Sequence, residues 1–264
     1  MKSNAWETME KVRLKRPIVH HITNWVTTYD CANIVKVFGA SPVMAHAKEE
    51  VAEMAGIASA LVLNIGTLTE DLVEAMLLAT KSANQKGIPV VLDVCGAGAT
   101  KFRNDMCSKI LDEVKVGIIK GNASEIASIS GENVQTRGVD AATVEKDLQE
   151  VATRLAKKMS CTVVITGIED IVADGKRVVL VKNGHSMMAN IVGTGCMATS
   201  VIGAFAAVEE DLVEASVAGL VCYEVASEVA AKAAKGPGTF KEKLFDAVFN
   251  LDAKTVDRMQ RVEE

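Results

Sequence analysis

The first part of the chain alternates between short continuous apolar runs and longer stretches with helical spacing. Residues 59–65 form a short run that is apolar except for Ser59 and Asn64 near its ends. Such a run is typical of a buried strand. Residues 69–86 follow with helical spacing, with Thr69 at the expected N-cap and Gly87 at the expected end. The same patterns predict further strands at 89–94, 116–120 and 161–166, and further helices at 101–114 and 143–159.

The pattern changes after residue 166. Residues 171–181 contain two apolar runs separated by Asp174-Gly175, which predicts a hairpin. From Gly195 onward the spacing is helical to the end, apart from a break at 236–238. Strands alternating with helices predict an α/β fold with a mainly parallel central sheet, helices on both faces and a small antiparallel edge. Because no linker or repeat interrupts the chain, we expect residues 1–264 to form a single domain.

The composition narrows the class of protein. The net charge is −5 and no block of lysine and arginine occurs, so nucleic acid is not an expected partner. The apolar stretches are interrupted before about 18 residues, and residues 1–16 lack the apolar core of a signal peptide, so neither a membrane span nor export is expected. The six cysteines are scattered without Cys-x-x-Cys spacing, which predicts reduced thiols in a cytoplasmic protein without a zinc site.

The segment most informative about chemistry is Asn-Ile-Val-Gly-Thr-Gly-Cys at residues 190–196, followed by a run of small apolar residues. Gly193 and Gly195 allow a tight turn, and the run predicts a helix, so free backbone N–H groups and the helix dipole form an anion site. Thr194 and Cys196 add a hydroxyl and a thiol to this turn. A reactive side chain on such a turn can act on a bound phosphoryl group. The same pattern also fits a glycine loop without catalytic function that leads into a core helix.

Three interpretations of Cys196 are open. It is a buried, inert thiol at a helix start, or a covalent nucleophile, or a thiolate that acts as a general base. A nucleophile needs a partner base, and the sequence shows no Cys/His pair that would supply one.

Polar side chains stand at the ends of the predicted strands: Asn64, Asp93, Lys120 and Thr166. In an open parallel sheet, ligands bind beyond the carboxyl ends of the strands, so these residues and the 193–196 turn predict one site. Asp93 precedes a glycine-rich turn and suits magnesium, or else serves as a turn or N-cap residue.

Two further segments carry alternatives of the same kind. Asn122 and Glu125 have the spacing of a capping box, or else Glu125 is a second carboxylate near the metal, with Lys120 as a phosphate contact. His20 and His21 are adjacent in a predicted strand and point to opposite faces, so at most one of them can serve a given site.

A series of motifs runs through the chain in this order: His20-His-Ile-Thr-Asn24, Asp30-Cys-Ala-Asn33, Gly39-Ala-Ser-Pro-Val-Met-Ala45, Leu61-Val-Leu-Asn-Ile-Gly-Thr67, Leu92-Asp93, Gly96-Ala-Gly-Ala-Thr100, Gly121-Asn-Ala-Ser-Glu125, Val164-Ile-Thr-Gly167, Asn183-Gly-His185 and Gly193-Thr-Gly-Cys196. The series closely resembles the hydroxyethylthiazole kinase family of thiamine salvage, which has a three-layer ribokinase-like fold. The resemblance extends from about residue 17 to residue 238.

The resemblance implies phosphorylation of 4-methyl-5-(2-hydroxyethyl)thiazole by ATP with Mg²⁺. It also implies a homotrimer with active sites between subunits. Related ribokinase-like enzymes carry an aspartate base in the last position of the turn, where this family and this chain have Cys196. The other roles implied by the matching motifs are substrate binding by Met44, Gly193 and Asn24, ATP binding by Lys120, Thr166, Thr194 and Gly195, and magnesium binding by Asp93 and Glu125.

The chain departs from the family pattern at a few positions. Val94-Cys95 follows Asp93 where Pro-Val is usual, and Val192 precedes the turn where Thr is usual. His46 stands where Asp is usual, and Lys120 stands where Arg is common, which keeps the charge but loses the bidentate fork.

Several other functions compete with this one. A ribokinase-like kinase for a related small heterocyclic alcohol and an ATP-dependent hydrate dehydratase share the expected fold, but such enzymes usually carry Asp at the position of Cys196. A protein that binds thiazole or nucleotide without turnover has no need of a base at the phosphoryl turn. A cysteine hydrolase or transferase is the remaining alternative and requires a covalent intermediate on Cys196.

Overall fold

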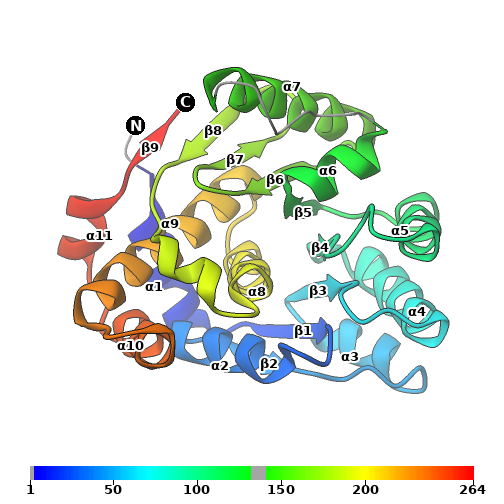
Figure 1. The fold of residues 1–264 in the computed structure, drawn as a ribbon. Coiled ribbons are helices and arrows are strands. Elements are labelled where there is room, and N and C mark those ends of the chain that lie inside the picture. Colours follow the sequence, from blue (N-terminus) through cyan, green and yellow to red (C-terminus); the bar gives the residue numbers. More distant parts are fainter. Residues whose placement is uncertain (1–2, 132–140) are drawn as a thin grey trace.

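The protein is built around one central sheet (Figure 1). The computed structural model describes residues 3–131 and 141–264, and within these residues nine strands pair in the order β2-β1-β3-β4-β5-β6-β7-β8-β9. The strands are β1 (Ile18–Ile22), β2 (Ser41–Val43), β3 (Ala60–Asn64), β4 (Val90–Asp93), β5 (Ile118–Asn122), β6 (Thr162–Thr166), β7 (Asp170–Ala173), β8 (Val178–Val181) and β9 (Val262–Glu263).

The direction of the strands confirms the predicted α/β class. Strands β1 to β6 pair in parallel, while β7, β8 and β9 add antiparallel pairings at one edge. The hairpin turn begins at Asp174, as expected, and spans 174–177, closed by a hydrogen bond from the Asp174 N–H to the Arg177 carbonyl. The expectation that the chain is helical to its end was wrong, because β9 pairs with β8. A two-residue strand has no periodicity of its own, and only its long-range pairing defines it.

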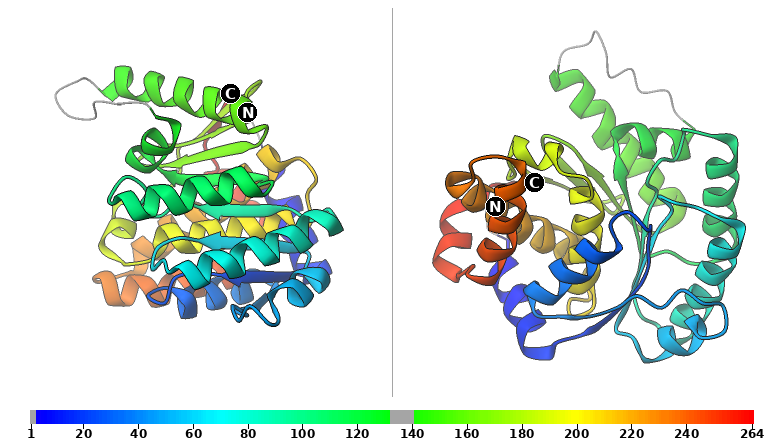
Figure 2. Two further views of the ribbon diagram at one scale, coloured as in Figure 1. Left: turned by 90° about the vertical axis from the view of Figure 1, so that its right-hand side faces the viewer. Right: turned by 60° about the horizontal axis from the view of Figure 1, so that its bottom comes forward.

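Helices cover both faces of the sheet, as predicted (Figure 2). One buried cluster joins the sheet to α3, α4, α5, α6 and α7, and the other joins it to α1, α2, α8, α9, α10 and α11. The helices are α1 (Ala5–Lys15), α2 (Thr28–Phe38), α3 (Val51–Ile57), α4 (Glu70–Lys86), α5 (Lys101–Glu113), α6 (Ala123–Ser130), α7 (Ala141–Met159), α8 (Thr194–Ala206), α9 (Leu212–Ala233), α10 (Pro237–Phe249) and α11 (Ala253–Met259), with the 3-10 helix η1 (Ser186–Asn190) before α8. None of the helices in the described residues is long and apolar enough to cross a membrane.

Local sequence signals set most element boundaries. Thr69 caps α4 by accepting a hydrogen bond from the Leu72 N–H, and Gly87 ends this helix in the left-handed conformation, as expected. Strand β5 differs, since it begins at Ile118 and continues to Asn122 rather than spanning 116–120. Its register with β6 pairs Asn122 with Thr166, so pairing with a neighbour extends the strand into a polar segment.

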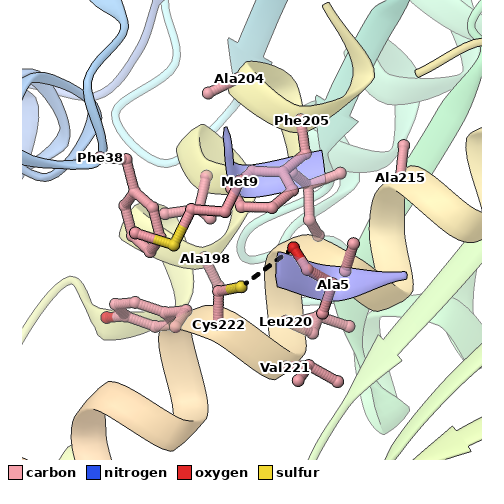
Figure 3. Packing of buried hydrophobic residues seen from close by; sticks show 14 of the residues in the cluster. Ala5, Met9, Phe38, Ala198, Ala204, Phe205, Ala215, Leu220, Val221 and Cys222 are labelled. Atoms are coloured by element: carbon pink, nitrogen blue, oxygen red, sulfur yellow. Dashed lines mark hydrogen bonds between the residues drawn. The ribbon is translucent and has the colours of Figure 1, made fainter. Parts of the chain in front are cut away.

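Helix α8 packs unusually close to the sheet. Its residues 197–206 are all buried, and it lies in the core beside α9, where Phe38, Phe205, Met9 and Cys222 pack together (Figure 3). A Cβ atom on Gly203 would lie 2.3 Å from Cγ2 of Val62 on β3, so only glycine allows this approach. The packing brings the N-terminus of α8 to the edge where the parallel strands end.

We expect Gly203→Ala to destabilise the fold by about 1–3 kcal/mol, because the branched, buried Val62 side chain has no room to move aside. Thermal and urea unfolding would measure the loss. Gly56→Ala is the matched control, since Gly56 lies in α3 and a Cβ there meets nothing closer than 3.8 Å. That variant should hold or raise stability, by up to about 1 kcal/mol. Equal effects of the two substitutions would contradict the close packing of α8.

Candidate active site

The predicted polar residues at the strand ends lie side by side. Asn64 on β3 pairs in register with Asp93 on β4, and Asp93 pairs with Lys120 on β5. All three side chains are buried. Because adjacent parallel strands end at one edge, the three residues form a continuous polar row below the N-terminus of α8.

Lys120 links this row to α8. Its Nζ lies 3.6 Å from Oδ2 of Asp93 and donates a hydrogen bond to the carbonyl of Gly195 at 3.2 Å. Burial alone lowers the pKa of Lys120, but the negative charges of Asp93, Cys196 and Glu125 outweigh it, so the pKa is raised and the ammonium stays charged. Thr199 on α8 completes the link by donating to Oδ2 of Asp93 at 2.6 Å, a contact that the sequence did not reveal.

Cys196 lies in the first turn of α8 with two amide donors on its sulfur. Nδ2 of Asn24 is 3.4 Å from Sγ, and Nδ2 of Asn64 is 3.3 Å from it. A hydrogen bond from Cys95, with help from Thr27 and Lys120, lowers the pKa of Cys196 to about 6 against the opposing effects of burial and Asp93. Cys196 is half-buried rather than fully buried, and the choice among its three interpretations stays a prediction.

The same contact has the opposite effect on Cys95. Its hydrogen bond to Cys196, together with burial and the charge of Asp93, raises the pKa of Cys95, so this thiol keeps its proton. His20 bonds to the carbonyl of Ala45 and His21 to that of Val19, and within the described residues neither histidine has a hydrogen bond to Cys196. Cys95, the residue that departs from the family pattern, therefore donates to the thiolate of Cys196.

We expect Cys95→Ala to raise the pKa of Cys196 above about 6, because the thiolate loses its strongest donor. The pH dependence of Cys196 alkylation by iodoacetamide, followed by peptide mass spectrometry, measures this pKa directly and does not depend on any enzymatic activity. Cys161→Ala is a suitable control, because Cys161 is a buried thiol directly before β6 and is not among the groups that shift the pKa of Cys196. An unchanged midpoint in Cys95→Ala would show that Cys95 does not stabilise the thiolate.

Gly193 turns the chain into α8 and meets the loop that follows β1. Its φ is 95°, and a Cβ atom there would lie 2.6 Å from Cγ2 of Thr27, so both the backbone conformation and the space require glycine. Asn24 holds this loop in place, since its Oδ1 accepts from the N–H and the Oγ1 of Thr27 and its Nδ2 donates to Oδ1 of Asn64. The loop after β1 and the Gly193–Cys196 turn thus form one rigid unit.

Glu125 has the capping-box role that the sequence left open. Its Oε2 accepts the N–H of Asn122, and the Asn122 side chain accepts the N–H of Glu125. Its Oε1 accepts the N–H of Gly96 at 2.7 Å, which fixes the glycine-rich turn after Asp93. Arg103, a residue not anticipated from the sequence, fastens the same turn by donating to the carbonyls of Ile65 and Cys95.

A cavity of about 750 Å³ opens beside the turn. Its lining includes three residues expected to bind ATP, namely Thr166, Thr194 and Gly195. This volume is in the range of small-ligand and cofactor pockets. Met44 is not part of the lining of this cavity. It lies directly after β2, at the same edge of the sheet, and is half-buried.

A pair of buried carboxyl groups lies in the cavity wall, Asp170 at the start of β7 and Glu224 within the apolar α9. Burial raises the pKa of both groups, and the hydrogen bond between them raises that of Glu224 further. Within the described residues, Oδ2 of Asp170 and Oε2 of Glu224 have no other hydrogen-bond partner, and a proton held on Glu224 and donated to Asp170 would satisfy both. The available sequence signal was the position of Glu224 inside a stretch of α9 that is otherwise apolar or small from residue 215 to residue 227.

We expect the pair to make wild-type stability depend on pH. A raised folded-state pKa contributes stability below the ordinary carboxyl pKa, and this is lost by up to about 1.4 kcal/mol per pH unit as the pH rises towards the folded-state value. Glu224→Gln needs no proton for this hydrogen bond. The melting temperature of the variant relative to that of wild type should therefore increase from pH 4.5 to pH 8. Glu224→Ala, which lacks the hydrogen bond, should be destabilised across the range. Melting curves of wild type and Glu224→Gln that shift in parallel with pH would contradict the shared proton.

The mainly parallel sheet with an antiparallel edge and helices on both faces has the ribokinase-like fold. A solved ribokinase-like superfamily protein from Enterococcus faecalis shares this fold with a TM-score of 0.61 at 14% identity, over 88% of this chain and 86% of that chain. A structure described as hydroxyethylthiazole kinase protein from Pyrococcus horikoshii OT3 is far more similar, with a TM-score of 0.91 at 39% identity over 98% of both chains.

The sequence comparisons agree. The model of the hydroxyethylthiazole kinase family matches residues 9–254. A hydroxyethylthiazole kinase from Methanosarcina mazei is 56% identical over 256 residues, which are 97% of this chain and 98% of that protein. The chain therefore belongs to the hydroxyethylthiazole kinase family.

Proposed function

We propose that this protein transfers the γ-phosphoryl group of ATP to the hydroxyl of 4-methyl-5-(2-hydroxyethyl)thiazole in thiamine salvage. The observation that carries the proposal is the Cys196 thiol, which has a lowered pKa and lies in the first turn of α8 next to the Lys120–Asp93 pair. Family membership supports the kinase chemistry. A general base near neutral pH beside an anion site is what transfer to an alcohol requires.

Cys196 as a thiolate accepts the proton of the acceptor alcohol as the oxygen attacks phosphorus. Asn24 and Asn64 hold its sulfur by their amide donors. The first hydrogen bond within α8 runs from the Met197 N–H to the Gly193 carbonyl, so the N–H groups of residues 194–196 have no partner within the helix. These donors face the charge that develops on the phosphoryl oxygens.

Lys120, Thr166, Thr194 and Gly195 are the proposed ATP contacts, with the ammonium of Lys120 countering phosphate charge. The carboxylates of Asp93 and Glu125 fit Mg²⁺, which takes one or two protein carboxylates and otherwise keeps water and phosphate ligands. Both oxygens of Glu125 already accept backbone N–H groups, which suits contact through water better than direct ligation. When bound, the metal supplies neutralisation of charge on the phosphates.

The acceptor alcohol is proposed to lie among Asn24, Gly193 and Met44, within reach of the Cys196 sulfur. The homotrimer with active sites between subunits stays a prediction from the family resemblance, and the cytoplasmic location stays a prediction from the scattered cysteines.

The first test is ADP release with ATP, Mg²⁺ and hydroxyethylthiazole, beside a control without the alcohol. We expect thiazole-dependent ADP release together with the phosphate ester, identified by mass spectrometry. ATP binding without thiazole-dependent release would refute this function, and a screen of other small heterocyclic alcohols and of hydrated nicotinamide nucleotides would then separate the remaining alternatives.

The base role of Cys196 gives a second test. Cys196→Ala should lower kcat by about a hundredfold or more, because the alcohol loses its proton acceptor. Cys196→Asp should retain or raise kcat, since a carboxylate can accept the same proton. Wild-type kcat should decrease as the pH is lowered through about 6, because the thiolate becomes protonated. Equal kcat in wild type and Cys196→Ala would remove the base role and leave only positioning.

A further inference from the structure

Two aromatic rings meet at the surface, on loops that follow β1 and β2. The Trp25 indole and the His46 imidazole are 5.1 Å apart between ring centroids, at an interplanar angle of 86°. Trp25 is 56% exposed, and His46 is exposed as well. An edge-to-face pair of exposed rings leaves ring faces open to a further aromatic partner.

Trp25 lies in the chain between two residues that contact the Gly193–Cys196 turn. Asn24, the residue before it, contacts Sγ of Cys196, and Thr27, two residues after it, packs against Gly193. The Trp25 N–H also donates to Oγ1 of Thr67 at 3.1 Å. Trp25 therefore extends from a loop whose neighbouring residues are fixed on the Gly193–Cys196 turn.

His46 is fixed in a similar way from the other loop. Its Nδ1 lies 3.3 Å from the carbonyl of Met44, and the carbonyl of Ala45 is bonded to the buried His20 of β1 at 2.7 Å. The ring pair thus bridges the loop after β1 and the loop after β2, and its His46 ring contacts the backbone of Met44. Both loops follow strands that end at the edge where Cys196 lies.

We propose that Trp25 and His46 form an aromatic wall of the acceptor site, against which the heteroaromatic ring of the alcohol stacks, and that Trp25 thereby sets the preference for aromatic over saturated acceptors. This inference rests on the proposed function, because it assigns the ring of the same acceptor whose hydroxyl faces Cys196. Stacking on a ring that is otherwise half-exposed removes apolar surface of both partners from water and holds the hydroxyl arm in one direction.

The chain contains two tryptophans, Trp6 and Trp25, which permits a direct binding test. Trp6 lies in α1 under the guanidinium of Arg13 and packs on the core, so Trp6→Phe leaves Trp25 as the single indole with little effect on the site. In that variant, titration with hydroxyethylthiazole without ATP should change the Trp25 emission and saturate. The converse variant, Trp25→Phe, should show no such change in the emission of Trp6.

Kinetics then separate a substrate contact from a structural role. Trp25→Leu should raise KM for hydroxyethylthiazole by about tenfold or more with KM for ATP unchanged, and Trp25→Phe should restore most of the affinity. Discrimination against an alcohol with a saturated ring should shrink in Trp25→Leu. Tyr29→Leu is the matched control, since Tyr29 is another exposed aromatic residue at the start of α2, 77% exposed, and its KM values should stay those of wild type.

The outcomes are distinguishable from failure of the proposed function. Wild-type turnover of hydroxyethylthiazole with unchanged Trp25 emission, or with equal KM in Trp25→Leu, would overturn the stacking wall while leaving the activity in place. Absence of wild-type turnover would refute the activity, and the emission titration would still decide whether Trp25 binds the thiazole ring.

Discussion

The arrangement of the site depends on the interactions of the buried Lys120 ammonium. A charge in the interior is stable only when it is paired and hydrogen-bonded, and Lys120 has Asp93 on the neighbouring strand and the Gly195 carbonyl on α8 as its partners. These contacts tie the sheet edge to the first turn of the helix. Thr199 adds a second tie to the same carboxylate. The position of the Gly193–Cys196 turn over the strand ends is therefore determined by electrostatics as well as by the close packing of α8 on β3.

The same compact arrangement explains why a thiol can be ionised here. Asn24, Asn64 and Cys95 surround the Cys196 sulfur with donors, and Lys120 supplies a positive charge nearby, while Asp93 opposes ionisation. Neutral donors stabilise a thiolate without adding net charge where anionic phosphates are proposed to bind. In the adjoining cavity the Asp170–Glu224 pair follows the same logic, because the shared proton limits the pair to one negative charge.

Rigidity at this edge comes from side chains that bond to backbone. Asn24 fixes the loop after β1, Arg103 and Glu125 fix the glycine-rich turn after β4, and His20 fixes the loop after β2. Each anchor is buried or half-buried, and two of them, Asn24 and Glu125, are also proposed to lie at the ligands. A phosphotransferase depends mainly on positioning, so anchored loops with projecting side chains suit that chemistry.

The sequence by itself determined the class of fold, most of the helices and strands, and the gathering of Asn64, Asp93, Lys120 and Thr166 with the Gly193–Cys196 turn at one edge. These features depend on local periodicity, on caps such as Thr69 and on the rule that parallel strands end together. Only the tertiary structure decided that Cys95 meets Cys196, that Thr199 and Arg103 support the site, that Glu224 lies against Asp170, and that β9 forms the last strand at one edge of the sheet. Each of these is a contact between segments far apart in the chain, and residue spacing carries no information about which distant side chains meet.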